Sequence, residues 1–203
     1  MFRLQGNTGR VFLGRDRGSG MAELKKVYFV RHGESQWNVE DKICGVTDSP
    51  LTEKGRTQAA ATGQAILDLG IQADMILHSP LQRATKTAEI ISEITGIPLR
   101  EEPRLIEQAF GIWEGTSPRD SVEFFLAKLN FIYSFETGES MFRVAQRIYN
   151  LLDDLRSDDH TFILVAHNGI ARFVKSYFQD MANEDFAKFG IQNAEVCEFV
   201  FRQ

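Results

Sequence analysis

Short apolar runs alternate with helical patterns along the chain from residue 24 onward. The runs cover residues 24–30, 74–78 and 161–166, and each is almost continuously hydrophobic, as expected for a parallel strand covered on both faces. Residues 194–201 partly alternate apolar and polar side chains, which is typical of an edge strand. This order predicts an α/β protein with three layers, α/β/α, around a mostly parallel sheet with one antiparallel edge strand.

Helical patterns fill the intervals between the predicted strands. One helix begins after Thr52 and ends at Gly70, which suits the left-handed position after a helix. The segment Ser79-Pro80-Leu81-Gln82 has the pattern of a capping box, with serine as N-cap, and predicts a helix from there to about Gly96. Apolar stripes at helical spacing predict two more helices, over residues 141–155 and 170–178, with the stripes facing the core.

Charge is distributed unevenly along the chain. The 203 residues, enough for one domain, include 23 Lys and Arg against 28 Asp and Glu, a net charge of −5. This balance argues against a general binder of nucleic acid or of anionic membranes. Residues 1–20 hold four arginines and one aspartate, so residues 21–203 alone carry −8. An anionic ligand would therefore require a local cluster of cations.

The first 20 residues differ from the rest of the chain. They lack the apolar core of a signal peptide and end in Gly-Ser-Gly before Met21. We expect residues 1–20 to be a disordered leader or tag, with a basic docking arm as the alternative, and residues 21–203 to form the folded domain. No apolar run approaches the ~20 residues of a membrane span. Cys44 and Cys197 form no metal-binding or disulfide pattern, which predicts a cytoplasmic protein.

Residues from about 111 to 138 have the least regular pattern. They carry several aromatic side chains, including Trp113, Phe124, Tyr133 and Phe135. A segment of this kind between recognisable elements predicts an inserted lid. The alternative is one or two helices that cap the core, and the two interpretations are compatible.

Two predicted strands end in a histidine that glycine soon follows, at residues 31–33 (RHG) and 167–169 (HNG). Because ligands bind at the carboxyl ends of parallel strands, both imidazoles are expected to point into one crevice. The glycines would let backbone N–H groups approach an anion. We interpret His78 and His160 as packed or solvated side chains. No metal-binding pattern joins the histidines, so no metal site is predicted.

The segment Arg31–Asn38 (RHGESQWN) resembles the signature of the histidine phosphatase superfamily. The similar branch contains cofactor-dependent phosphoglycerate mutases and small phosphatases, including those acting on α-ribazole phosphate or on diverse monoesters. Further motifs follow in the family's order, so that the resemblance covers essentially residues 24–201. They are Gly45 with residues 48–52 (DSPLT), 79–84 (SPLQRA), 105–115 (LIEQAFGIWEG), 138–140 (GES) and 166–167 (AH).

The resemblance implies a phosphomonoester hydrolase that needs neither metal nor cofactor. It assigns His32 as the nucleophile that forms a phosphohistidine, and a neutral imidazole is a competent nucleophile near neutral pH. It assigns Arg31, Arg83 and His167 to the phosphoryl oxygens, to which arginine forks are well suited. The predicted phosphate-binding residues are Arg31, Asn38, Gly45, Arg83, His167 and Asn168.

The resemblance identifies Glu107 as the general acid and base. A carboxylic acid held partly protonated can serve the leaving alkoxide and then the attacking water. In another branch of the superfamily an aspartate follows the second histidine, but Asn168 stands there and cannot donate acidically. Glu34 and Glu114 are rival carboxylates. We expect Glu34 to orient motif residues and Glu114 to be structural.

A cofactor-dependent phosphoglycerate mutase is the first alternative. In mutases, a tyrosine, a lysine and an arginine pair after the catalytic glutamate bind the anionic substrate. Here Phe110 holds the tyrosine position and no Arg-Arg pair occurs between Glu107 and Gly138. This favours hydrolysis of a small phosphorylated metabolite whose alcohol portion is not highly anionic. A catalytically weak binding module is the second alternative, and nothing in the sequence indicates the oligomeric state.

Overall fold

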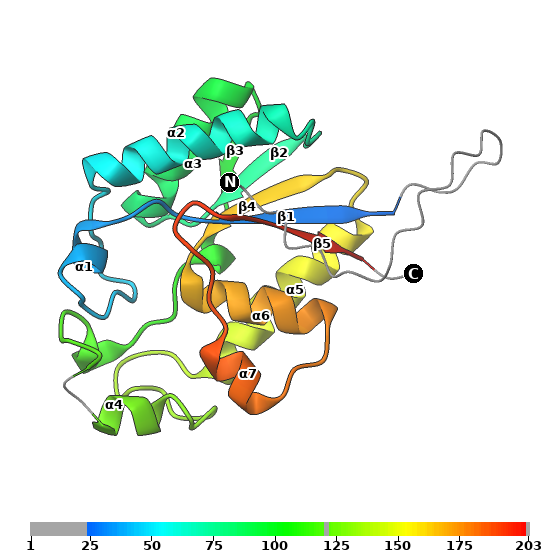
Figure 1. Cartoon of the computed structure of the whole chain (residues 1–203). Coiled ribbons are helices and arrows are strands. Elements are labelled where there is room, and N and C mark those ends of the chain that lie inside the picture. Colours follow the sequence, from blue (N-terminus) through cyan, green and yellow to red (C-terminus); the bar gives the residue numbers. More distant parts are fainter. Residues whose placement is uncertain (1–23, 120–121, 202–203) are drawn as a thin grey trace.

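The computed structural model describes residues 24–119 and 122–201 (Figure 1). The predicted leader, residues 1–20, lies outside the described residues and stays a prediction. Five strands form one sheet in the order β3-β2-β4-β1-β5. The strands are β1 (Lys26–Arg31), β2 (Met75–His78), β3 (Leu99–Glu101), β4 (Phe162–Ala166) and β5 (Val196–Val200). Only the β1–β5 pair is antiparallel, so the predicted mostly parallel sheet with an antiparallel edge strand is confirmed.

Helices cover both faces of this sheet (Figure 1). Helices α2 (Glu53–Asp68) and α3 (Gln82–Thr95) lie on one face, and α5 (Met141–Ser157) and α6 (Asn168–Phe178) lie on the other. Successive side chains of a strand point to opposite faces. Tyr28 and Val30 of β1 therefore pack in the cluster with α2 and α3, whereas Val27 and Phe29 pack in the cluster with α5 and α6. Burial on both faces explains the continuous apolar runs of β1 and β4.

Several short elements were not predicted from the sequence. The three residues of β3 are all exposed, so this strand leaves no apolar run in the sequence. Helices α1 (Gln36–Val39), α4 (Val122–Ala127) and α7 (Asn183–Lys188) are too short to establish a helical period. Two 3₁₀ helices, η1 (Pro103–Leu105) and η2 (Gly111–Trp113), complete the elements of the described residues. These pieces depend on tertiary contacts for their conformation.

The ends of α2 confirm the sequence prediction. The Thr52 Oγ1 atom accepts a hydrogen bond from the Gly55 N–H at 3.0 Å, as an N-cap does. Gly70 follows the last helical turn with a φ of +64°. This left-handed conformation is easily reached by glycine, so the helix ends where the sequence predicts.

The predicted capping box at Ser79 is wrong. Helix α3 begins at Gln82 with Leu81 as its N-cap, and the Ser79 Oγ atom lies 2.7 Å from Nε2 of His167. The first N–H of the helix is instead satisfied by Asp48, whose Oδ2 accepts from the Gln82 N–H at 3.0 Å. A carboxylate brought by tertiary folding thus replaces the local serine.

The segment of residues 111–138 contains η2 and α4 and builds a small core of its own. Ile43, Phe124 and Phe135 are buried together, and Phe110 and Trp113 pack against them. The ring centroid of Phe110 lies 5.5 Å from that of Phe124 and 5.2 Å from that of Phe135. The short helices agree with the capping alternative, and motion of this segment as a lid stays a prediction.

Two further features concern the environment of the chain. Within residues 24–119 and 122–201, no helix combines the length and the apolar character needed to cross a bilayer. Both cysteines carry free thiols, that of Cys44 half-buried and that of Cys197 buried.

The loop after β1 lies directly on the first turn of α2. A Cβ atom on Gly55 would lie 2.1 Å from the carbonyl oxygen of Glu34, and one on Gly33 would lie 2.3 Å from the carbonyl oxygen of Gly55. Both positions therefore require glycine, because a methyl group would push the two backbones apart.

We expect Gly55→Ala to lower the free energy of unfolding by about 1–3 kcal/mol, because overpacking outweighs the gain of ~1 kcal/mol in helix propensity. Urea unfolding followed by circular dichroism measures the change. The matched control is Arg56→Ala on the exposed side of the same turn, which should stay within about 0.5 kcal/mol of the parent. A Gly55→Ala protein as stable as the parent would show that the contact is not restrictive.

Candidate active site

The carboxyl ends of β1 and β4 bring His32 and His167 together. These strands are neighbours in the sheet, and their last paired residues are Arg31 and Ala166. The N–H of His32 donates to the carbonyl of Ala166 at 2.9 Å. The two imidazole centroids lie 5.2 Å apart, and the residues are 4% and 0% exposed. The structure thus gathers the two histidines that the sequence places at separate strand ends.

The backbone fixes the tautomer of His32. Its Nδ1 lies 2.7 Å from the carbonyl oxygen of Gly33, and a carbonyl can only accept, so Nδ1 carries the proton. Nε2 therefore keeps its lone pair. Burial lowers the pKa of His32 well below its usual value, and the charges of Arg83 and Arg31 lower it further. The side chain is a neutral imidazole with a nucleophilic Nε2 at neutral pH.

His167 is held by Ser79, a contact that the sequence analysis missed. The Ser79 Oγ atom accepts from the Leu81 N–H at 3.3 Å and lies within hydrogen-bond distance, 2.7 Å, of Nε2 of His167. Nδ1 of His167 is buried without a hydrogen-bond partner among the described residues. Burial, with the charge of Arg83, holds the pKa of His167 well below its usual value.

Two arginines flank the histidines, and backbone carbonyls hold both. Arg31 donates from Nη1 to the carbonyl of Ile191 at 2.7 Å. The fully buried Arg83 donates from Nη2 to the carbonyl of Gly45 at 2.7 Å and from Nη1 to that of Thr47 at 3.0 Å. The Nε atoms of both arginines are buried without a partner in the described part of the chain. Carbonyls orient these guanidinium groups without neutralising them.

Glu107 lies beside the second histidine loop. Its Oε2 accepts from the Gly169 N–H at 2.9 Å and its Oε1 from the Gln108 N–H at 2.9 Å. The N–H of Gly33 donates to Oγ1 of Thr87 at 3.0 Å, another contact missed from the sequence. The expectation that both glycine N–H groups approach a ligand anion is therefore wrong, because protein side chains already occupy them. The anion that the Gly169 N–H binds is the carboxylate of Glu107.

The two predicted asparagines hold neighbouring backbone. The Asn38 Oδ1 atom accepts from the Ser35 N–H at 3.1 Å and from Nδ2 of Asn193 at 3.3 Å. The Asn168 Oδ1 atom accepts from the Ile191 N–H at 2.9 Å. Asn168 thus holds the loop of Ile191, whose carbonyl accepts a hydrogen bond from Arg31. Contact of either asparagine with phosphate stays a prediction.

Gly45 and the rival glutamates have structural contacts. A Cβ on Gly45 would lie 2.8 Å from the backbone carbonyl oxygen of Gln108, and 2.0 Å from Oε1 of Glu114, so glycine is favoured at this place. Oε1 of Glu114 accepts from the Phe110 N–H at 2.9 Å, which fits its predicted structural role. Glu34 accepts from the hydroxyl of Thr52 at 3.0 Å and so holds the N-cap of α2.

The remaining histidines and the nearby thiol lie outside the predicted chemistry. His78 is buried, with Nδ1 3.0 Å from the Ser79 carbonyl oxygen, and His160 is exposed beside Asp158. Burial raises the pKa of Cys44 to about 11, so this thiol is protonated at neutral pH. Among residues 24–119 and 122–201, no three metal-ligating side chains are grouped to hold an ion.

Asn193 belongs to the same site, although the sequence analysis did not select it. Its Nδ2 donates to the carbonyl of His32 at 3.0 Å. The next residue, Ala194, has a φ of +61°, and its backbone bonds the carbonyl of Arg31 and the hydroxyl of Thr62. A strained non-glycine turn is thus held by three contacts over the end of β1. An isolated asparagine in a loop offers no periodic or motif signal in the sequence.

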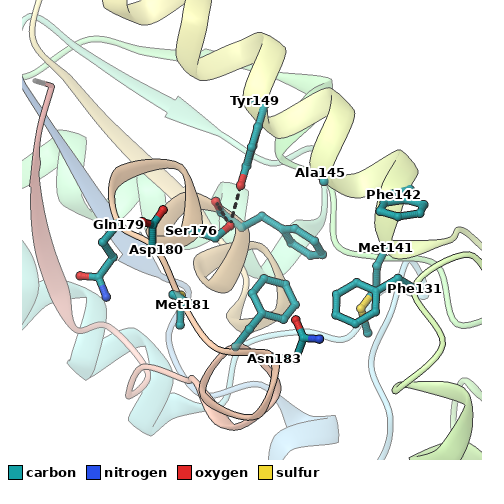
Figure 2. Close-up of a pocket in the computed structure, with 12 residues that line it drawn as sticks. Phe131, Met141, Phe142, Ala145, Tyr149, Ser176, Gln179, Asp180, Met181 and Asn183 are labelled. Carbon is teal, nitrogen blue, oxygen red and sulfur yellow. Dashed lines mark hydrogen bonds between the residues drawn. The ribbon is translucent and has the colours of Figure 1, made fainter. Parts of the chain in front are cut away.

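A separate cavity of about 480 Å³ lies between α5 and the α6–α7 segment (Figure 2). Apolar side chains dominate its lining, among them Phe131, Met141 and Met181. In Figure 2 the hydroxyl groups of Tyr149 and Ser176 are joined by a hydrogen bond, of 2.9 Å. None of the predicted site residues lines this cavity, and no cation does, so its chemistry does not suit a phosphoryl group.

The arrangement can bind an anion next to a nucleophile. Three buried nitrogen atoms, Nε of Arg31, Nε of Arg83 and Nδ1 of His167, have no hydrogen-bond partner among the described residues. Buried N–H groups in proteins are nearly always hydrogen-bonded. With His32 as the predicted nucleophile and Glu107 as the predicted proton carrier, this set has the groups that phosphoryl transfer needs.

The two buried neutral imidazoles predict a stability that falls in acid. In the unfolded chain each takes up a proton near pH ~6.5, whereas the folded protein resists it, so protons favour unfolding below that pH. We expect the free energy of unfolding to drop by roughly 2–3 kcal/mol between pH 7.5 and 5.5. Urea unfolding at both pH values measures this, with His32→Gln/His167→Gln as the variant that loses the dependence. A parent equally stable at pH 5.5 would contradict the assignment.

Comparison with known proteins agrees with the geometry. A family model of the histidine phosphatase superfamily (branch 1) matches residues 27–203. A probable phosphoglycerate mutase GpmB from Erwinia tasmaniensis is 37% identical over 155 residues, which cover 73% of this chain and 71% of that protein. A solved mycobacterial glucosyl-3-phosphoglycerate phosphatase has a TM-score of 0.76 and 27% identity, with 86% and 92% of the two chains covered. For the α-ribazole phosphatase from Shigella flexneri the values are 0.73, 26%, 85% and 89%. The chain belongs to the histidine phosphatase superfamily.

Proposed function

We propose that this protein is a phosphomonoester hydrolase that forms a phosphohistidine on His32, uses Glu107 as general acid and base, and needs no metal ion. One observation carries the proposal. The buried Nε atoms of Arg31 and Arg83 and Nδ1 of His167 lack partners among the described residues, next to a neutral imidazole. Guanidinium groups and imidazoles gathered in this way provide the charged donors that bind a phosphoryl group.

In the first step, Nε2 of His32 attacks phosphorus. A nitrogen–phosphorus bond forms, the bond from phosphorus to the alcohol oxygen breaks, and the leaving alkoxide takes the proton of Glu107. Arg31 and Arg83 offset the charge on the equatorial oxygens, which is the main protein contribution to such transfers. Because carbonyls orient the arginines and the Asp48 carboxylate stands 3.9 Å from Arg83, much of their charge is available to the phosphoryl group.

In the second step, water attacks the phosphohistidine. Glu107, now ionised, removes a proton from the water, the nitrogen–phosphorus bond breaks, and Nε2 of His32 recovers its lone pair. Inorganic phosphate leaves, and the enzyme returns to its starting protonation. Burial of Glu107 behind the histidine loop suits a group that moves a proton in a dry site.

The solved relatives favour hydrolysis. The mycobacterial glucosyl-3-phosphoglycerate phosphatase that resembles this chain has been solved with VO3 and with inorganic phosphate. Two cationic donors and a single nucleophile also suit one phosphoryl group. As substrate we propose a small phosphorylated metabolite rather than nucleic acid or a membrane lipid, because residues 21–203 carry −8.

A phosphoglycerate mutase remains the second candidate, favoured by the 37% identity to a probable phosphoglycerate mutase. A mutase returns the phosphoryl group to its product instead of to water. Interconversion of phosphoglycerates that depends on a bisphosphate primer would support it. A binding module of the same fold is disfavoured, because its loss of catalysis would usually remove one of the charged groups, and His32, Arg83 and Glu107 are all present.

We expect purified protein to hydrolyse 4-nitrophenyl phosphate at pH 6–7 in the presence of EDTA. The variant His32→Ala should lose both turnover and an acid-labile phosphoprotein trapped by rapid quenching, because no nucleophile is left. The control is His160→Ala, which removes an exposed histidine and should retain full activity. Turnover that requires added metal, or that survives His32→Ala, would refute the mechanism.

Glu107→Gln should slow hydrolysis according to the leaving group. We expect kcat to fall by roughly 10²–10⁴-fold for an alkyl phosphate, whose alkoxide needs a proton, and by less in phosphorylation from 4-nitrophenyl phosphate. Single-turnover rates for both substrates separate the two steps. Glu114→Gln is the matched control carboxylate. An equal loss for both leaving groups in the phosphorylation step would rule out general acid catalysis by Glu107.

A further inference from the structure

Asn193 precedes β5 and bridges the loop of His32 to helix α1. Its Nδ2 lies 3.0 Å from the carbonyl oxygen of His32 and 3.3 Å from Oδ1 of Asn38, which belongs to α1. An amide nitrogen carries two N–H groups, so one side chain can donate to both oxygens at once. The half-buried Asn193 thus joins the backbone of the proposed nucleophile to a predicted phosphate-binding residue.

The orientation of both amide groups follows from their neighbours. The Ser35 N–H can only donate, so the atom of Asn38 that lies 3.1 Å from it is the oxygen. A backbone carbonyl can only accept, so the atom of Asn193 that meets His32 is the nitrogen. Oδ1 of Asn38 therefore accepts two hydrogen bonds, and Nδ2 of Asn38 makes none with the residues that the structure describes. This donor nitrogen is available to a ligand.

Both polar groups of the His32 backbone are hydrogen-bonded. The N–H donates to the carbonyl of Ala166 at 2.9 Å, and the carbonyl accepts from Asn193. The first bond continues the pairing of β1 with β4, whereas the second comes from the loop before β5. Together they fix the point from which the imidazole extends. Misplacement of a reacting group by about 1 Å can slow a reaction on the order of 10²-fold.

The loop of Asn193 has anchors that do not involve the Asn193 side chain. The Ala194 N–H donates to the carbonyl of Arg31 at 2.9 Å, and the Thr62 hydroxyl donates to the carbonyl of Ala194 at 2.7 Å. Nη1 of Arg31 donates in turn to the carbonyl of Ile191. These contacts lie on both sides of Asn193 in the sequence. The loop therefore keeps its anchors when the Asn193 side chain is replaced.

We propose that Asn193 is a positioning residue for phosphoryl transfer to His32. By donating to the His32 carbonyl, it keeps the imidazole in place for attack. By donating to Oδ1 of Asn38, it keeps Nδ2 of Asn38 free to donate to a phosphoryl oxygen. Asn193 acts through these two residues and not by contact with the substrate. The inference rests on the proposed function, which supplies the phosphoryl group beside His32.

Titration calorimetry with inorganic phosphate tests the action through Asn38. Asn193→Ala should weaken phosphate binding by about 5–10-fold, as expected for the loss of one orienting hydrogen bond. In the Asn38→Ala background the same substitution should change the affinity by less than about 2-fold, because the oriented amide is already absent. The control is Gln192→Ala, which alters an exposed neighbouring side chain and should leave the affinity unchanged. Equal weakening in both backgrounds would overturn the inference, since Asn193 would then only support the fold.

Kinetics with 4-nitrophenyl phosphate test the action through His32. Asn193→Ala should lower the single-turnover rate of phosphorylation by about 10-fold and should also raise KM. In the Asn38→Ala background it should still lower this rate but leave KM unchanged. A general loosening of the fold would not divide its effects between the rate and KM in this way. A phosphorylation rate equal to that of the parent would contradict the proposed role.

Two isosteric variants keep the test decisive if Asn193→Ala does not fold. Asn193→Asp fills the same space without an N–H group, so it should reproduce the losses expected for Asn193→Ala. Asn38→Asp keeps both accepted hydrogen bonds but replaces Nδ2 by an anionic oxygen. It should match the parent in urea unfolding and bind inorganic phosphate at least about 10-fold more weakly. Phosphate binding by Asn38→Asp as tight as that of the parent would refute the inference.

Failure of the inference is distinguishable from failure of the proposed function. A parent that hydrolyses 4-nitrophenyl phosphate, with equal losses of phosphate affinity in both backgrounds, keeps the proposed function and overturns the inference. A parent that hydrolyses no phosphomonoester defeats the proposed function. The phosphate titrations then decide the inference alone, because they need no turnover. A parent that binds no inorganic phosphate at millimolar concentration overturns the inference as well.

Discussion

The parallel pairing of β1 with β4 is the interaction on which the site depends. Five residue pairs, from Val27 with Phe162 to Arg31 with Ala166, fix the register of the two strands. Their side chains are buried on both faces, so a slip by one residue would turn every apolar group to the wrong layer. The same register sets the two following histidines side by side. The strand register that buries the apolar side chains therefore also positions His32 and His167.

Neutral backbone carbonyls orient the positively charged arginines of the site. Backbone carbonyls of Ile191, Gly45 and Thr47 orient the two arginines, and the nearest carboxylate oxygen recorded for Arg83, on Asp48, is 3.9 Å away. Cations oriented in this way keep their charge for a ligand. Burial, together with these cations, lowers the pKa of both imidazoles, so that His32, the proposed nucleophile, is neutral.

Much of the site followed from the sequence because its elements are local. The strand-histidine segments, Arg83 within its motif and Glu107 within another all stand in the printed order of residues. The wrong predictions concern polar groups that have two possible hydrogen-bond partners. Ser79 could cap a helix or support His167, and the Gly169 N–H could approach a ligand or Glu107. Only the folded chain decides between partners that are far apart in sequence.

The sequence by itself determined the layered α/β class and the antiparallel edge, and it selected the groups proposed to react, because apolar periodicity and short motifs are properties of neighbouring residues. Tertiary structure alone decided that Asp48 caps α3 and that Asn193 holds the loop of His32. Each of these contacts joins residues that are more than 20 positions apart. Their energies depend on distance and burial in space, which no local pattern of residues encodes.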